Sequence, residues 1–259
     1  MKKTLAGALL TGAMLGTLAA GNALAADMPV KAPMLMKAPA PVYNWTGCYI
    51  NAGAGYGMWN QEAQSETFPG LTALSPTDTI GGRGWFGTVG GGCDYQVSSS
   101  IVIGILGDYD FGDIKGTFAD PNTGDFGTES EKWAWSIGGR VGWLLTPTIL
   151  TYVSAGYTEA HFNQVDLNDF FTGLPTGASL PAQTYPGWFI GSGFDYAINF
   201  LPLPQGLFLR TEYRFSSYED EDIEYTNSGA ICDVGSCGLH SRKFVQTVRT
   251  SLVWRFNWH

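Results

Sequence analysis

Two histidines are the residues best suited to acid–base chemistry in this sequence, and both lie in or beside polar stretches. His240 directly precedes Ser241, and His161 lies two residues after Glu159. Hydrolysis by a serine needs the nucleophile beside a base that a third group orients. Adjacent side chains of an extended segment point in opposite directions, and His161 has no evident nucleophile near it in the sequence. We therefore expect no catalytic residues and no enzymatic activity.

Carboxylates concentrate in one short acidic run, which could bind a divalent cation through hard oxygen ligands. The run comprises Glu219, Asp220, Glu221, Asp222 and Glu224. A solvated loop explains the same residues without a ligand. The histidines His161, His240 and His259 do not cluster in sequence, and the cysteine spacing does not fit a zinc ribbon. We therefore expect no metal site and no cofactor.

The N-terminus has the pattern of a secretory signal peptide, which we assign to residues 1–25. Lys2 and Lys3 precede a small and apolar stretch, and Ala23-Leu24-Ala25 supplies the small residues of a cleavage site. An uncleaved anchor helix is the alternative. After cleavage, 12 basic residues face 23 acidic ones, a net charge of −11, which argues against nucleic acid as a partner. Residues 26–44 are rich in Pro and Ala, so we expect an extended periplasmic linker.

Residues 45–259 have the composition and pattern of a single all-β domain. Aromatic residues reach 14%, 35 residues are glycine and only 14% are charged, which favours strands. The segments predicted as strands, each long enough to cross a hydrocarbon core, are 46–59, 84–97, 101–114, 132–145, 148–162, 184–198, 206–219 and 243–258. The long polar connections between them, which alternate with short turns, are 60–83, 115–131, 163–183 and 220–242. This order is typical of an eight-stranded antiparallel up-and-down transmembrane β-barrel with both termini in the periplasm.

Alternation along the strands separates an apolar face from a face that carries glycine and charge. The pattern fits either a soluble barrel or a membrane barrel with its faces reversed. Glycine on the polar face and the scarcity of lysine in the strands favour the membrane barrel, because small residues fit a narrow interior. An arginine on the lipid face costs about 2–4 kcal/mol at mid-bilayer. The strand charges are therefore expected to fill and close the lumen: Asp108, Asp110, Arg140, Asp195, Arg210, Glu212, Arg214, Arg249 and Arg255.

Tryptophan and tyrosine concentrate towards the strand ends, where half-apolar rings suit the two interfaces of a membrane. The expected aromatic girdles comprise Trp133, Trp135, Trp143, Trp188, Tyr196, Trp254 and Trp258. The chain stops within a residue of an apolar-alternating strand that ends in an aromatic. We expect that last strand to engage the barrel-assembly machinery.

Five short runs carry a family resemblance. They are Asp27-Met28-Pro29-Val30-Lys31-Ala32-Pro33, Tyr43-Asn44-Trp45-Thr46-Gly47-Cys48-Tyr49-Ile50, Gly92-Cys93-Asp94-Tyr95-Gln96, Gly104-Ile105-Leu106-Gly107-Asp108-Tyr109 and Val253-Trp254-Arg255-Phe256-Asn257-Trp258. Together they resemble the small alphaproteobacterial outer-membrane β-barrel proteins, the porin-family or opacity-type surface antigens. The resemblance covers about residues 27–258. It implies an eight-stranded barrel in the outer membrane, surface exposure and a contribution to envelope integrity, without fixing one biochemical activity.

The resemblance also bears on the four cysteines, because an exported chain with an even number of them suggests disulfides. The expected register places Cys48 and Cys93 near the periplasmic ends of the first two strands, within reach of each other. Cys232 and Cys237 bracket a short turn in the last outer loop. We interpret them as two bridges, Cys48–Cys93 and Cys232–Cys237, with two unpaired cysteines in lipid as the alternative for the first pair.

Three function classes remain open at this point. The favoured one is a structural and surface protein with a charge-filled lumen, in contact with outer-membrane lipids and lipopolysaccharide and with loop ligands that the sequence does not name. A narrow porin-like channel for small solutes is the alternative, and a lipid-A-modifying enzyme comes third. All three place the chain in the cell outer membrane, after export through the periplasm.

Overall fold

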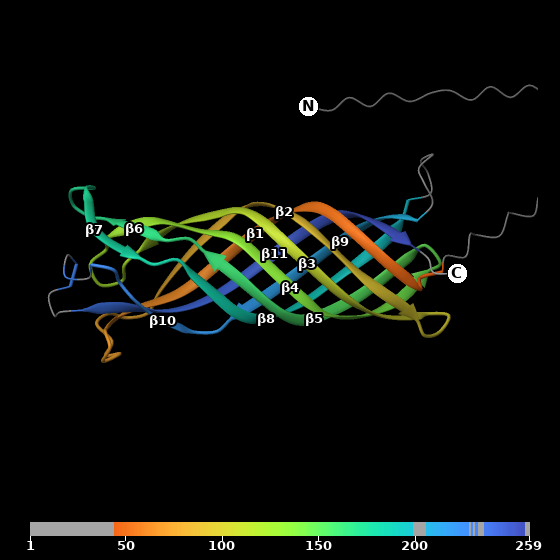
Figure 1. The fold of residues 1–259 in the computed structure, drawn as a ribbon, viewed down its shortest axis with the longest axis horizontal. Helices are drawn as coiled ribbons and strands as arrows, with labels where there is room; N and C mark the ends of the chain where they lie inside the picture. The colour runs from red at the N-terminus through yellow and green to blue at the C-terminus, as the bar shows by residue number, and fades with distance from the viewer. Residues whose placement is uncertain (1–43, 199–205, 228, 230, 233–235, 257–259) are drawn as a thin grey trace, which may run out of the picture. The chain divides into compact units, whose positions relative to one another are not determined.

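A computed structural model describes residues 44–198, 206–227, 229, 231–232 and 236–256 of the chain. Eight strands form the wall of a barrel (Figure 1): β1 (Gly47–Thr67), β2 (Asp78–Gln96), β3 (Ile101–Ala119), β4 (Phe126–Thr146), β5 (Ile149–Phe162), β8 (Gln183–Ala197), β9 (Leu207–Tyr218) and β11 (Cys237–Phe256). Three short strands, β6 (Val165–Asn168), β7 (Pro175–Leu180) and β10 (Glu221–Glu224), lie between them in sequence. No helix in the described part of the chain has the length and apolar character needed to cross a membrane.

The wall is a closed ring of antiparallel strands. Each wall strand pairs with the next one along the chain, and β1 pairs with β11 to complete the ring. The β1–β11 register runs without interruption from Cys48 opposite Phe256 to Thr67 opposite Cys237. The expected all-β, eight-stranded, antiparallel up-and-down barrel is therefore confirmed.

The two ends of the barrel differ in their connections. At one end, which we call the turn end, residues 97–100 join β2 to β3 and residues 147–148 join β4 to β5. The opposite end, the loop end, carries the longer connections, including the β6–β7 hairpin and β10, which pairs with β11 (Figure 1).

The strands extend well into the connections that we expected to be long polar loops, and that expectation is wrong. β1 continues to Thr67, β2 begins at Asp78, and β11 begins at Cys237. The cause is a reversal of the alternation near the loop end, where Trp59 and Ala63 point inward and are fully buried while Asn60 and Glu62 point outward and are exposed. The strand prediction looks for apolar residues on the outward face. A wall segment with polar residues outside and apolar residues inside therefore resembles a loop by that criterion.

Four sequence-based assignments fall wholly or mainly outside the described residues. They are the signal peptide at 1–25, the linker at 26–44 apart from Asn44, the short turn at 199–205 between the predicted strands 184–198 and 206–219, and the last girdle residue, Trp258.

Candidate functional site

The middle of the barrel wall has charge on its inner face and apolar side chains on its outer face. On β3, Ile103 and Ile105 point outward with exposed fractions of 45% and 67%, whereas Asp108 points inward. The inward arginines, Arg210 and Arg214 of β9 and Arg249 and Arg255 of β11, are at most 5% exposed. Because water-soluble barrels have the opposite arrangement, the outer face has the character of a lipid-facing surface.

The inward charges nearest the turn end form a first layer of three arginines and two aspartates. Arg210 donates two hydrogen bonds to Asp195, from Nε to Oδ1 at 2.7 Å and from Nη2 to Oδ2 at 2.8 Å. Arg255 donates from Nη2 to Asp195 Oδ2 at 3.0 Å and contacts Asp94 Oδ2 at 2.7 Å. Arg140 bridges both carboxylates, since it pairs with Asp94 and lies 3.4 Å from Asp195 Oδ2. Paired geometry of this kind is what offsets the cost of burying charge.

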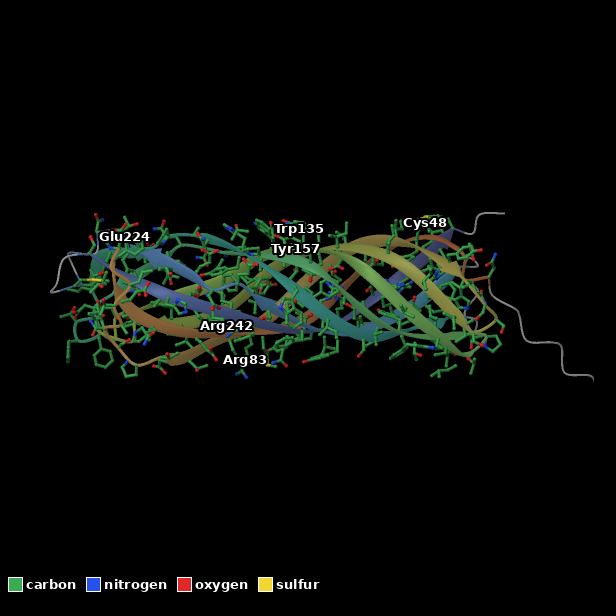
Figure 2. The ribbon with its side chains drawn as sticks, turned by 90° about the horizontal axis from the view of Figure 1, so that it is seen from below. Cys48, Arg83, Trp135, Tyr157, Glu224 and Arg242 are labelled. Carbon is green, nitrogen blue, oxygen red and sulfur yellow. A yellow bond between two sulfur atoms is a disulfide. The ribbon has the colours of Figure 1, made fainter. Side chains whose placement is uncertain are left out.

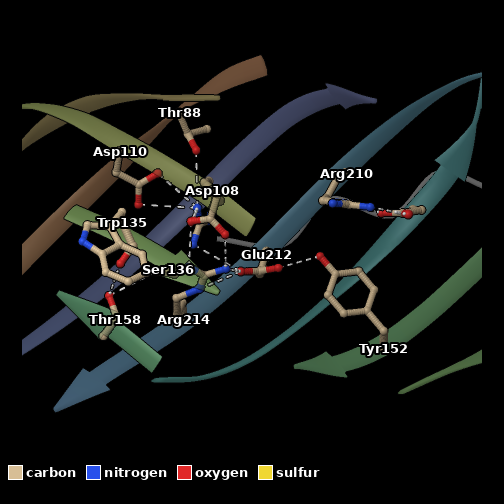
Figure 3. Close-up of polar contacts among 12 residues, drawn as sticks. Thr88, Asp108, Asp110, Trp135, Ser136, Tyr152, Thr158, Arg210, Glu212 and Arg214 are labelled. Carbon is tan, nitrogen blue, oxygen red and sulfur yellow. Dashed lines mark hydrogen bonds and ion pairs between the residues drawn. The ribbon is translucent and has the colours of Figure 1, made fainter. Parts of the chain in front are cut away.

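A second layer lies nearer the loop end and joins two arginines to three carboxylates (Figure 3). Arg214 donates from Nη1 and Nη2 to the two oxygens of Asp108 at 2.8 and 2.9 Å. Arg249 Nη1 contacts Asp108 at 2.8 Å and Asp110 at 3.1 Å. Glu212 lies between the two arginines, 2.8 Å from Arg214 and 3.3 Å from Arg249.

The two layers act as one neutral plug. Tyr152 donates its hydroxyl to Glu212 Oε2 at 2.7 Å and stacks beneath the guanidinium of Arg140, which links the layers. The first layer carries one surplus positive charge and the second one surplus negative charge, so the formal charges cancel. A cavity of about 10 Å³ remains beside Asp108 and Arg210, which is room for about one water molecule. The ion pairs of both layers therefore fill the interior at this level of the barrel.

Lys243 and its partners form a third buried polar group, outside the lipid-facing band. They lie in the interior of the loop end, among buried apolar side chains that include Trp59, Phe118 and Phe162. Lys243 is fully buried; its Nζ donates to Gln61 and to Glu129 Oε1, the latter at 2.6 Å, and lies 4.3 Å from the ring centre of Phe162. Burial lowers the pKa of Lys243, and the Glu129 carboxylate opposes this change. Glu131 is 5% exposed nearby, and burial raises its pKa to about 8.

The raised pKa of Glu131 gives the protein a defined pH response. Between its ordinary value of 4.5 and about 8, the folded chain keeps a proton that the unfolded chain releases. Stability should therefore fall as pH rises through this window, by at most about 1.4 kcal/mol per pH unit. Glu131→Gln should remove this slope in urea unfolding measured in lipid vesicles from pH 5 to 9. Glu224→Gln, at an exposed position, is the control, and equal slopes in E131Q and the unaltered chain would contradict the assignment.

Aromatic side chains border the apolar outer band at both ends. Trp143, Tyr196 and Trp254 are exposed near the turn end. Trp188 is exposed near the loop end, where Trp133 stacks on the His161 ring at 5.1 Å.

Trp135 and Tyr157 lie side by side on the outer surface (Figure 2) and both donate to Glu159, at 3.0 and 2.7 Å. Rings with one apolar and one hydrogen-bonded edge suit a membrane interface.

The structure joins the cysteines in the two pairs that the sequence suggested. Cys48 and Cys93 are directly opposite each other in the β1–β2 register and form a disulfide near the turn end. Cys232 and Cys237 form the second disulfide, at the start of β11. Each bridge ties a strand to its neighbour or to its own loop, so neither alters the path of the barrel wall.

The candidate nucleophile and base of the last connection lie on opposite faces of β11. Ser241 points inward, where its Oγ accepts a hydrogen bond from Gln61 Nε2 at 3.0 Å. His240 points outward and its Nδ1 lies 2.6 Å from Asp222 Oδ1. His161 hydrogen bonds to Thr184 Oγ1 at 2.9 Å. Neither histidine is therefore paired with a serine.

The structure brings the nine predicted lumen residues together and adds others that the sequence did not single out. Asp94 completes the first layer, although its strand reads mainly as a glycine-rich run. Lys243 and Glu129 were missed because their pairing spans the barrel between β11 and β4. The alternation of inward and outward positions, continued along the whole strand, is the sequence signal that could have placed them inside the barrel.

Comparison with known proteins places this architecture among bacterial barrels. Residues 17–231 match a family described as outer membrane protein beta-barrel domain. The chain is 26% identical over 250 residues to the 31 kDa outer-membrane immunogenic protein of Brucella melitensis, and equally to that of Brucella suis, covering 94% of this chain and 98% of the relative. The crystal structure of OprG from Pseudomonas aeruginosa has a TM-score of 0.57 at 11% identity, covering 82% of this chain and 97% of OprG. This last likeness concerns the fold alone.

Proposed function

The chain belongs to the outer membrane protein beta-barrel domain family, and from that premise we propose that it is a non-enzymatic structural protein that displays its loop end on the cell surface. It is an outer-membrane protein, as its relatives are. In barrels of this type, short turns face the periplasm and long connections face outward. The loop end accordingly faces the exterior, and the turn end, where β1 begins and β11 ends, faces the periplasm.

The ion-paired interior is the observation that carries the proposal. Five arginines and five carboxylates from six of the eight wall strands fill the interior across the lipid-facing band. A passage for solutes needs a continuous polar path, whereas the cavity beside Asp108 and Arg210 holds about 10 Å³ and another beside Asp110 and Thr247 about 10 Å³. The outer apolar band contacts lipids and lipopolysaccharide, and the last strand, β11, is the element through which the assembly machinery engages the barrel. The word immunogenic in the relatives' name supports surface display.

Planar-bilayer recording tests the closed lumen against the narrow-channel alternative. The purified chain should give no nanosiemens-scale current steps, because ion pairs block the interior over two layers. A variant with Arg214→Ala and Arg249→Ala should leak more than the unaltered chain, since it loses the cations of the second layer. Stable open steps in the unaltered chain would favour the channel and defeat the proposal.

A further inference from the structure

Three side chains capable of binding metal meet on the outer wall of the loop end. Glu66 comes from β1, Asp222 from β10 and His240 from β11, and their ligand atoms all lie within 4.8 Å of one another. The register explains the meeting: Asp222 is directly opposite His240 in the β10–β11 pair, and Gln64 is opposite His240 in the β1–β11 pair. β10 lies beside β11 at the loop end (Figure 1), beyond the lipid-facing band.

Glu66 has a carboxylate oxygen that lacks a hydrogen-bond partner. The residue is only 6% exposed, and its Oε1 has no hydrogen-bond donor among the described residues. Burial raises the pKa of Glu66, and the negative charge of Asp222 raises it further. A buried carboxylate oxygen without a donor is costly. A cation between Glu66 and Asp222 would supply the contact that Oε1 lacks. It would also offset the repulsion between the two carboxylates.

The donor set selects a class of ion. One imidazole nitrogen and two carboxylate oxygens are ligands that Zn²⁺ accepts, commonly as three protein ligands with water in the fourth position. Two carboxylates and a neutral imidazole also balance the ion's two positive charges. Ca²⁺ and Mg²⁺ bind through oxygen, so the histidine favours zinc over them. His240 Nδ1 lies 2.6 Å from Asp222 Oδ1, so two of the ligands are already adjacent.

We propose that Glu66, Asp222 and His240 form a surface binding site for Zn²⁺, which clips β10 to the barrel wall. The site lies outside the lumen, so it is independent of whether the barrel conducts. It also departs from the sequence-based expectation of no metal, which considered the acidic run of 219–224 and the histidines separately. The acidic run contributes one ligand, Asp222, and the other two come from neighbouring strands.

Calorimetric titration of the untagged mature chain in detergent micelles with Zn²⁺ tests the site. One Zn²⁺ per chain should bind, and His240→Ala should weaken the affinity at least about tenfold, because even a group behind a metal ligand contributes that much. Glu66→Gln and Asp222→Asn should each weaken it as well. The matched controls are Glu62→Gln, an exposed carboxylate on the same strand, and His161→Ala, a histidine paired with Thr184. Both should keep the affinity of the unaltered chain.

X-ray absorption of the zinc-loaded chain supplies a second readout. The nearest shell should contain nitrogen and oxygen at about 2.0–2.2 Å and no sulfur, which excludes capture by reduced Cys232 or Cys237. Heat-dependent gel migration verifies that each variant is folded. The proposal fails if H240A binds Zn²⁺ as tightly as the unaltered chain, if no saturable binding occurs, or if a sulfur shell appears. Binding of Ca²⁺ in place of Zn²⁺, unaffected by H240A, would also overturn it.

Discussion

Asp195→Ala is expected to lower the free energy of unfolding by about 3–5 kcal/mol, the range for removing one partner of a buried ion pair. Asp195 is fully buried and contacts three arginines, Arg140, Arg210 and Arg255. Its removal leaves Arg140 and Arg255 with Asp94 alone, and Arg210 loses both of its hydrogen bonds to a carboxylate. Urea unfolding in lipid vesicles, followed by tryptophan fluorescence, measures the loss.

An exposed ion pair provides the control for this effect. Asp113 pairs with Lys115 and Lys132 but its side chain is 48% exposed, and surface pairs contribute about 0–1 kcal/mol. Asp113→Ala should therefore change stability little. If D195A and D113A lost equal stability, the first layer would be solvated, and the interior would not be a buried ion-paired plug.

The lumen was largely predictable because strand parity is a local property. Once Leu209 is assigned outward, Arg210 and Glu212 must point inward, and the same rule places Arg249 and Arg255 on β11. The pairing of particular charges was not predictable, because it depends on how strands far apart in sequence face one another across the interior. The contact of Arg214 with Asp108, for example, joins β9 to β3.

The loop end was harder to predict for a physical reason. The sequence-based prediction applies one rule to the whole strand, with apolar residues outward and polar residues inward. Beyond the lipid-facing band the surroundings of the wall become aqueous, so the rule reverses: Phe118 and Phe162 are buried inside, whereas Thr117 is exposed outside. A prediction that lets the inward face change from polar to apolar midway along a strand would extend β1, β3 and β4 correctly.

The proposed zinc ligands show a second limit. Asp222 and His240 were noticed separately, and Glu66 was not noticed at all. Their meeting depends on the β1–β11 closure and on the short strand β10. A register error of one residue in either pair would turn a ligand to the opposite face, so composition and spacing alone could not assemble the site.

Ile105→Arg is expected to lower stability in a bilayer by about 2–4 kcal/mol, the cost of an arginine on the lipid face at mid-membrane. Ile105 is 67% exposed on the outer face of β3. It lies midway between Ile101, near the turn end, and Phe111, where the lipid-facing part of the strand ends. The guanidinium would lie among acyl chains without a carboxylate beside it. Urea unfolding in vesicles again provides the measurement.

Thr117→Arg on the same strand separates the effect of lipid from the effect of the substitution itself. Thr117 also points outward and is exposed, but it lies beyond the lipid-facing band, where water can solvate the guanidinium. T117R should therefore stay within about 0.5 kcal/mol of the unaltered chain, as surface changes usually do. Equal losses for I105R and T117R would mean that lipid does not cover the wall at Ile105. A large loss for I105R alone places the membrane boundary between these two positions of β3, because the strand, its pairing and the introduced side chain are otherwise the same.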